Sequence, residues 1–282
     1  MTAAADRAAS RAADLAFATA IAARAGELQV ERFEKVERID YKSAKDVVTE
    51  VDHLSEALII DAIRAVHPTD GIIAEESGDH ASGAGHAPTA GIGRAWVIDP
   101  LDGTINYANG IPFFCVSIAL VEAGRPIVGV IRDPIRGETF AASDLAPATL
   151  NGRPITASTK DKLIDFVVSM ALSGPALISR ARTVRKAIRV PRSMGSAALA
   201  LAYVGNGRFD AFVQQGGLSL WDIAAAGLIA ERAGATVTNL TGGPWFDLSD
   251  KPRSIGVLAA PADHHPDLLS LIGGPESERA GK

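Results

Sequence analysis

The stretch Trp96-Val97-Ile98-Asp99-Pro100-Leu101-Asp102-Gly103-Thr104 carries most of what this sequence predicts about fold and chemistry. The apolar run from Ala95 to Ile98 is typical of a buried strand. Proline fixes φ and glycine permits unusual φ, so the residues after this strand are expected to form a stiff, tight turn. Asp99 and Asp102 should therefore lie close together beyond the end of the strand, where open α/β sheets bind their ligands.

Two carboxylates held this close repel each other, and a divalent cation is the simplest remedy. Hard oxygen ligands favour Mg²⁺. The alternative is a surface turn in which Asp and Gly serve only the backbone geometry. This stretch alone leaves both interpretations open, so the other acidic segments of the chain have to decide between them.

Three further segments place acidic residues where such a metal site would need them. The apolar run Ile72-Ile73-Ala74 is followed by Glu75-Glu76, which repeats the order of strand and then acids. Asp222 opens a helical pattern, where it also suits the first turn of a helix. The segment from Asp46 to Asp52 begins another helical pattern. Each acid could be only a cap, a solvated side chain or a loop residue, but the four segments together favour a shared site.

These segments resemble the four ordered signatures of the inositol monophosphatase family, namely Asp46-Val-Val-Thr-Glu-Val-Asp52, Glu75-Glu76-Ser77, Asp99-Pro-Leu-Asp-Gly-Thr104 and Trp221-Asp222. The resemblance extends from about residue 10 to about residue 272. It implies a layered αβαβα sandwich of the inositol monophosphatase and fructose-1,6-bisphosphatase type. It also implies a Mg²⁺-dependent phosphomonoesterase that is sensitive to lithium and often dimeric.

The resemblance implies a metal site with two to three Mg²⁺ ions, for which Ca²⁺ or Mn²⁺ could substitute in a crystal. The expected ligands are Glu75, Asp99, the carbonyl of Leu101, Asp102 and Asp222. Two such ions, roughly 3.5–4 Å apart, can neutralise a phosphate dianion and lower the pKa of a bound water.

The resemblance also assigns catalytic roles. Thr104, hydrogen-bonded to Asp52, is expected to help Glu75 orient and deprotonate the attacking water. The backbone N–H groups of Gly103 and Thr104 are free to cradle phosphate oxygens.

The expected substrate residues are Gly103, Thr104, Gly195, Ser196, Ala197, Gln215 and Asp222. Gln215 stands seven residues before Asp222, where the family has an inositol-binding Glu, and a Gln there brings no charge. Inositol 1-phosphate is the first expected substrate. The alternatives are fructose 1,6-bisphosphate, histidinol phosphate, 3′-phosphoadenosine phosphate or NADP, or a regulatory binding protein built on the same fold.

Composition narrows the class of protein. The chain has 282 residues, a net charge of −5 and one Cys, so we expect a cytoplasmic protein with neither a nucleic-acid nor a membrane partner. The family resemblance adds the expectation of a homodimer that acts on a small phosphomonoester. Cys115 is expected to be a buried apolar thiol. His264 and His265 are expected to be solvated, and the basic run 180–192 is either a solvated helix face or a means of steering anionic substrate.

The pattern of elements predicts α+β organisation in residues 1–145, which carry most metal ligands, and α/β organisation in residues 146–282, which carry Asp222 and the substrate pocket. The two halves should form one compact unit. Helices are predicted over 4–25, 49–66, 176–187, 195–204, 222–233 and 266–272. Strands are predicted over 36–42, 72–74, 95–98, 113–121, 127–132, 138–142, 166–170, 209–213, 236–239 and 255–259. Residues 77–93 should be a loop, Asn151-Gly152 a turn and 274–282 a frayed tail.

Overall fold

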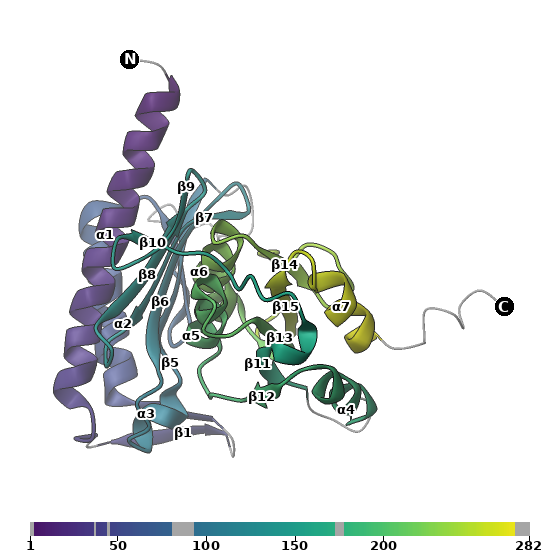
Figure 1. Cartoon of the computed structure of the whole chain (residues 1–282). Helices are drawn as coiled ribbons and strands as arrows, with labels where there is room; N and C mark the ends of the chain where they lie inside the picture. The colour runs from purple at the N-terminus through teal and green to yellow at the C-terminus, as the bar shows by residue number, and fades with distance from the viewer. Residues whose placement is uncertain (1–2, 37, 44–45, 81–92, 173–177, 274–282) are drawn as a thin grey trace.

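A computed structural model of the chain describes residues 3–36, 38–43, 46–80, 93–172 and 178–273. Its elements form five layers: two helices, a large sheet, two helices, a smaller sheet and two further helices (Figure 1). The predicted αβαβα sandwich is therefore confirmed. The expected tail lies outside the described residues, as do residues 81–92 of the expected loop.

The first layer is built from α1 (Ala3–Arg32) and α2 (Glu50–Val66), preceded by the short hairpin of β1 (Ile39–Ser43) and β2 (Asp46–Thr49). Helix α1 continues well past Ala25, where the sequence predicted its end. Gly26 lies inside the helix, where a Cβ would come within 3.1 Å of Arg132 on β7 and of Pro134 just after it. The glycine lets the helix pack closely against these residues, and the helix continues to Arg32.

The large sheet has the strand order β10-β9-β8-β7-β6-β5-β3-β4. Its strands are β3 (Gly71–Ala74), β4 (Gly78–His80), β5 (Arg94–Asp102), β6 (Cys115–Glu122), β7 (Arg125–Asp133), β8 (Glu138–Ser143), β9 (Ala146–Leu150) and β10 (Arg153–Pro154). The three successive strands predicted over 113–121, 127–132 and 138–142 are confirmed as β6, β7 and β8, which pair antiparallel in a meander. Strand β4 falls inside the segment that was expected to be a loop. Asn151 and Gly152 both have positive φ, as a two-residue hairpin turn between β9 and β10 requires.

The central helices are α5 (Ala197–Ala202), continued by a 3₁₀ turn over Tyr203–Asn206, and α6 (Leu220–Arg232). They pack between the sheets, and small side chains permit close approach: Ala224, Ala225 and Ala226 of α6 are fully buried. A Cβ on Gly129 of β7 would lie only 2.7 Å from the carbonyl oxygen of Ala225. The main hydrophobic core lies in this layer.

The smaller sheet has the order β12-β11-β13-β15-β14, formed by β11 (Val167–Ala171), β12 (Val190–Arg192), β13 (Ala211–Leu218), β14 (Ala235–Asn239) and β15 (Ile255–Pro261). It follows a 3₁₀ turn over Leu163–Asp165, and α4 (Ile178–Ala187) and α7 (His265–Gly273) cover its outer face (Figure 1). Since β9 and β10 still belong to the large sheet, the passage between the sheets falls after Pro154 and not at residue 145.

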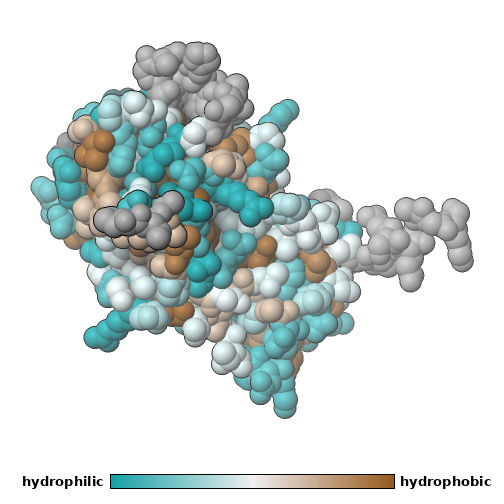
Figure 2. Space-filling model, turned by 90° about the horizontal axis from the view of Figure 1, so that it is seen from above, coloured by the Kyte–Doolittle hydropathy of each residue, from teal (hydrophilic) through white to brown (hydrophobic). Residues whose placement is uncertain are grey.

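On the face that Figure 2 shows, the hydrophobic residues stand in small groups among hydrophilic ones. No helix among the described residues combines the length and the apolar content that crossing a bilayer needs. The expectation for the histidine pair is wrong at His265, which is 5% exposed and whose Nε2 lies 3.0 Å from the hydroxyl of Thr238. His264 is partly covered and stacks edge-on against Phe166.

Candidate functional site

The predicted acidic turn lies at the end of β5, between β3 and β6 in the large sheet. The β5–β6 register shifts between Asp99 and Asp102, because the chain bulges at the intervening Pro100 and Leu101. The N–H of Leu101 donates to Oδ1 of Asp99 at 2.9 Å, which orients this carboxylate. The turn leads into the short helix α3 (Thr104–Ala108), and Gly103 is its N-cap residue. Gly103 has φ +100°, and a Cβ there would come within 3.1 Å of the carbonyl oxygen of Phe113. The turn therefore requires glycine at this point.

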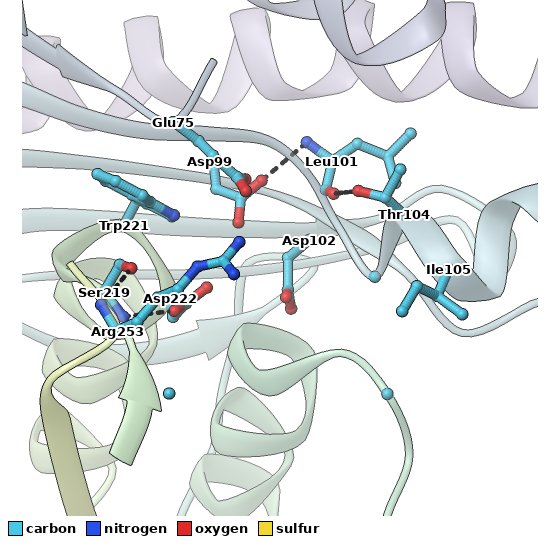
Figure 3. Close-up of a pocket in the computed structure, with 13 residues that line it drawn as sticks. Glu75, Asp99, Leu101, Asp102, Thr104, Ile105, Ser219, Trp221, Asp222 and Arg253 are labelled. Atoms are coloured by element: carbon cyan, nitrogen blue, oxygen red, sulfur yellow. Dashed lines mark hydrogen bonds between the residues drawn. The ribbon is translucent and has the colours of Figure 1, made fainter. Parts of the chain in front are cut away.

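Three carboxylates from two distant segments, β5 and α6, meet at this turn. Ligand oxygens of Asp99, Asp102 and Asp222 all lie within 4.8 Å of one another. Asp222 comes from the first turn of α6, where its Oδ2 also accepts the N–H of Ser219 at 2.6 Å in a capping box. Figure 3 shows the side chains directed toward a common space, a cavity of about 310 Å³ that Glu75 and Leu101 also line. A residue that caps a helix can thus serve the shared site as well.

The electrostatics of the cavity favour a cation. Burial raises the pKa of Asp99 well above its usual range, and the charges of Glu75, Asp102 and Asp222 raise it further. Burial likewise raises the pKa of Asp222, with Asp102 adding to the effect. A bound cation would remove both the desolvation cost and the repulsion. Because the donors are carboxylate and carbonyl oxygens, the residues present fit Mg²⁺.

Asp102 is held from the opposite side by the start of α5. The hydroxyl of Ser196 and the N–H of Ala198, the latter at 2.8 Å, both donate to its Oδ2. Burial raises the pKa of Asp102, and these hydrogen bonds oppose the rise. The buried thiol of Cys115, as expected an apolar core residue, lies 3.8 Å from the same oxygen. Asp102 thus links the large sheet to the central helical layer at the site.

The hydroxyl of Thr104 lies between two acceptors, Oδ1 of Asp52 at 2.9 Å and the carbonyl of Leu101 at 3.1 Å. Asp52 is fully buried, and its other oxygen accepts the N–H and the hydroxyl of Thr49 at 2.8 and 2.6 Å. The capping box at the start of α2 therefore fixes the Asp52 carboxylate and, through it, the Thr104 hydroxyl. The expected Thr104–Asp52 contact is present in the structure.

A second cavity of about 320 Å³ adjoins the first and shares Asp102, Gly195, Gly217 and Asp222 with it. Its other lining residues are uncharged: Ser169, Met170, Ala171, Ser193, Met194, Ser196, Ala197, Phe212, Gln214 and Leu218. Hydroxyl and amide groups thus stand beside apolar side chains, a combination that suits a neutral, polar organic group.

Comparisons with known proteins agree with this geometry. The family model described as "Inositol monophosphatase family" matches residues 11–273. The chain belongs to the inositol monophosphatase family. It is 39% identical over 242 residues to the Nus factor SuhB of Pseudomonas aeruginosa, covering 79% of this chain and 83% of that protein. It is 36% identical over 233 residues to the fructose-1,6-bisphosphatase/inositol-1-monophosphatase of Thermotoga maritima, covering 81% and 85%.

Among solved structures, extragenic suppressor protein suhB from Bartonella henselae superposes with a TM-score of 0.83 at 30% identity, covering 93% of this chain and 99% of that one. The overlap extends over both sheets, so the whole layered fold of the inositol monophosphatase family is present.

The structure corrects one residue of the expected substrate set. Gln215, placed by counting back from Asp222, is exposed and lines a separate groove with Arg180 and Leu269. Gln214 lines the second cavity instead. The cause is a bulge in β13: Gln214 pairs with Val257 and Leu218 with Ile255, so four steps along β13 face two along β15. Counting residues across this bulge selects the wrong side of the strand.

The family signatures did not indicate Arg253, which also lines the first cavity. Figure 3 shows its side chain reaching in among the labelled acids. Its backbone has φ +63°, and its N–H donates to the hydroxyl of Ser219 at 3.1 Å. Its charge lowers the pKa of Asp222, against the larger effect of burial. Arg253 lies in an irregular segment before β15, where no sequence period could have placed it.

Proposed function

We propose that this chain is a Mg²⁺-dependent phosphomonoesterase that hydrolyses a small polyol or sugar phosphate. The observation that carries the proposal is the convergence of Asp99, Asp102 and Asp222, whose ligand oxygens lie within 4.8 Å of one another. Membership of the inositol monophosphatase family supports the same chemistry.

Glu75, Asp99, the carbonyl of Leu101, Asp102 and Asp222 would hold two to three Mg²⁺ ions. When bound, the ions supply charge neutralisation for the phosphate, an activated water and stabilisation of the leaving oxygen. The burial of Asp99 and Asp102, 1% and 8% exposed, keeps the carboxylates in a fixed arrangement before substrate arrives.

Beside these metal ligands, other groups of the chain would orient the attacking water and accept its proton. The Thr104 hydroxyl donates to Asp52, so its lone pair is directed to accept a hydrogen bond from that water. Glu75, at the end of β3, lines the same cavity and is placed to take the proton. Gly103 and Thr104 line the cavity next to the acids, where their backbone can meet phosphate oxygens.

The second cavity would take the leaving alcohol. Its lining offers hydrogen bonds from Ser169, Ser193 and Gln214 but, apart from the metal-binding acids at its edge, no charge. This favours a neutral, hydroxylated leaving group, so inositol 1-phosphate remains the first substrate to test. The related phosphatase substrates that the sequence suggested form the rest of the panel.

The test is phosphate release from a panel of about ten phosphomonoesters, with and without Mg²⁺. Asp102→Asn should lower the release at least about 100-fold, since even outer-shell partners of a metal are worth 10–100-fold. The amide oxygen can still accept the N–H of Ala198, so the fold should persist. The exposed Asp61→Asn on α2 is the matched control and should keep full activity. An active Asp102→Asn variant would refute the metal assignment.

The names of several relatives support a second candidate, a regulatory protein on the same fold, because they are called Nus factor SuhB. The two functions are separable with the same variant. A regulatory effect that persists in Asp102→Asn, without phosphate release, would favour the second candidate. An effect lost together with activity would favour catalysis. The predicted absence of a nucleic-acid partner stays a prediction.

A further inference from the structure

The extension of α1 past Gly26 brings one side chain into contact with the acidic turn. Gln29 is fully buried, and its Nε2 donates to the carbonyl oxygen of Pro100 at 2.6 Å. Among the described residues, its Oε1 accepts no hydrogen bond. A buried amide with one strong bond and one unsatisfied oxygen is costly for stability alone. Its position therefore calls for an explanation beyond packing.

The hydrogen bond from Gln29 is one of two that hold the peptide group between Pro100 and Leu101. The carbonyl of Pro100 accepts from Gln29, and the N–H of Leu101 in the same peptide donates to Asp99 at 2.9 Å. A peptide group is planar and rigid, so bonds on both edges fix its rotation. That rotation decides how the Asp99 carboxylate is oriented and from which direction the chain presents the next carbonyl, that of Leu101.

A second bond connects the same residue to the far side of the turn. The hydroxyl of Tyr107, in α3, donates to the backbone carbonyl of Gln29 at 2.8 Å. Tyr107 is 1% exposed, and its ring packs against Phe33 of the segment after α1 and against Phe114. The end of α1 therefore contacts the chain both before Asp102 and after Gly103.

We propose that Gln29 is a positioning residue for the metal ligands of the turn, acting through the Pro100–Leu101 peptide. This inference rests on the proposed function, because it assumes that Asp99 and the Leu101 carbonyl hold Mg²⁺. Gln29 contacts neither the cavity nor a substrate. Its effect should therefore appear in the affinity for the metal before it appears in the chemical step.

The test replaces Gln29 with Met, which has a similar length and no donor, in the full chain. Calorimetry should show the Kd for Mg²⁺ rising by about 10-fold, the lower end of the range for outer-shell partners. The Tm in EDTA should change little, because one unsatisfied buried oxygen, Oε1 of Gln29, is exchanged for another, the carbonyl of Pro100. In phosphate-release assays, the Mg²⁺ activation curve should move to higher concentration while kcat at saturating Mg²⁺ is largely kept.

Tyr107→Phe is the matched control, since it removes a buried hydroxyl from the same cluster without touching the Pro100 carbonyl. It should lower Tm and leave the Mg²⁺ affinity within about twofold. Gln29→Met with unchanged Mg²⁺ affinity would overturn the inference, whether or not its Tm falls. If the wild-type chain binds Mg²⁺ but releases no phosphate, the proposed function fails and the Gln29 inference stands. If the wild-type chain binds no Mg²⁺, both fail.

Discussion

Neutralising Asp99 should make the metal-free protein more stable while abolishing its metal binding. Asp99 is 1% exposed and lies among acidic neighbours that raise its pKa together with burial. Asp99→Asn removes one charge from this group. The amide oxygen of Asn can still accept the N–H of Leu101, so the turn keeps its internal hydrogen bond. The substitution therefore changes charge with little change in shape.

The magnitude follows from the spacing of the carboxylates. Two unit charges 4.8 Å apart, the upper limit within the cluster of three, repel by about 3.5 kcal/mol at an effective dielectric constant near 20. Asp99 has two such neighbours, but Arg253, solvent in the open cavity and partial protonation reduce the repulsion. A net gain of about 2 kcal/mol is expected, which for a chain of this size corresponds to a Tm about 4 °C higher.

The gain should depend on pH with a definite sign. The pKa of Asp99 is raised in the folded state, so the unfolded carboxyl loses its proton at lower pH than the folded one. The wild type therefore loses stability as pH rises from the ordinary carboxyl range through the raised pKa. The advantage of Asp99→Asn should be small at pH 4.5 and larger at pH 7.5, when both proteins are melted in EDTA.

Adding Mg²⁺ should reverse the order of stability. At a concentration 100 times Kd, ligand binding adds about 2.7 kcal/mol to the wild type, whereas the variant has lost a ligand and gains little. Asp61→Asn, at an exposed position, controls for the change in net charge and should melt like the wild type. The reasoning is refuted if Asp99→Asn melts below the wild type in EDTA at pH 7.5, or if the difference does not grow with pH.

Substitutions at Thr104, Gln214 and Gly129, with Thr104→Ser and Gln215→Ala as matched controls, test the remaining parts of the site and fold. Thr104→Val should lower phosphate release by roughly 10²–10⁴-fold, whereas Thr104→Ser should keep most of it, because only the hydroxyl is needed. Gln214→Ala should raise KM about 5-fold by the loss of about 1 kcal/mol of hydrogen bonding, and Gln215→Ala should not, a comparison that steady-state kinetics can make. Gly129→Ala should lower the free energy of unfolding by about 1–3 kcal/mol in urea titrations, because its Cβ would lie 2.7 Å from the carbonyl oxygen of Ala225.

The sequence predicts the parts of this site that depend on local pattern. An apolar run followed by Asp99, Pro100 and Asp102 predicts a pair of adjacent carboxylates near the end of a strand. The predicted strand end at Ile98 is wrong, because β5 continues through a bulge to Asp102. The start of α6 is equally local, because Asp222 belongs to a capping box that the sequence displays. Residue spacing alone does not predict that the end of β5 and the start of α6 lie next to each other, because this depends on packing between the layers. There the family resemblance supplied what local pattern could not.

The errors arise where tertiary packing decides. Helix α1 was predicted to end at Ala25, but it continues through Gly26, where close packing against Arg132 of β7 favours glycine. Gln215 was chosen by counting, and a bulge in β13 moves Gln214 into its place. The first error concealed Gln29, since a helix ending at residue 25 would not have carried that side chain to the Pro100 carbonyl.

Two acidic residues of this site also cap helices, so their capping role is easily taken as their whole function. Asp222 satisfies the capping box of α6, and Asp52 that of α2, so either could be dismissed as a residue that only begins a helix. A capping role alone does not explain why the Asp222 carboxylate is desolvated, because a capping carboxylate that stays in water avoids the desolvation cost. Burial of Asp222 beside Asp102 costs stability that the helix start does not require. A bound Mg²⁺ would offset this cost further than Arg253 does, so the metal-free melting experiment tests the function and the fold together.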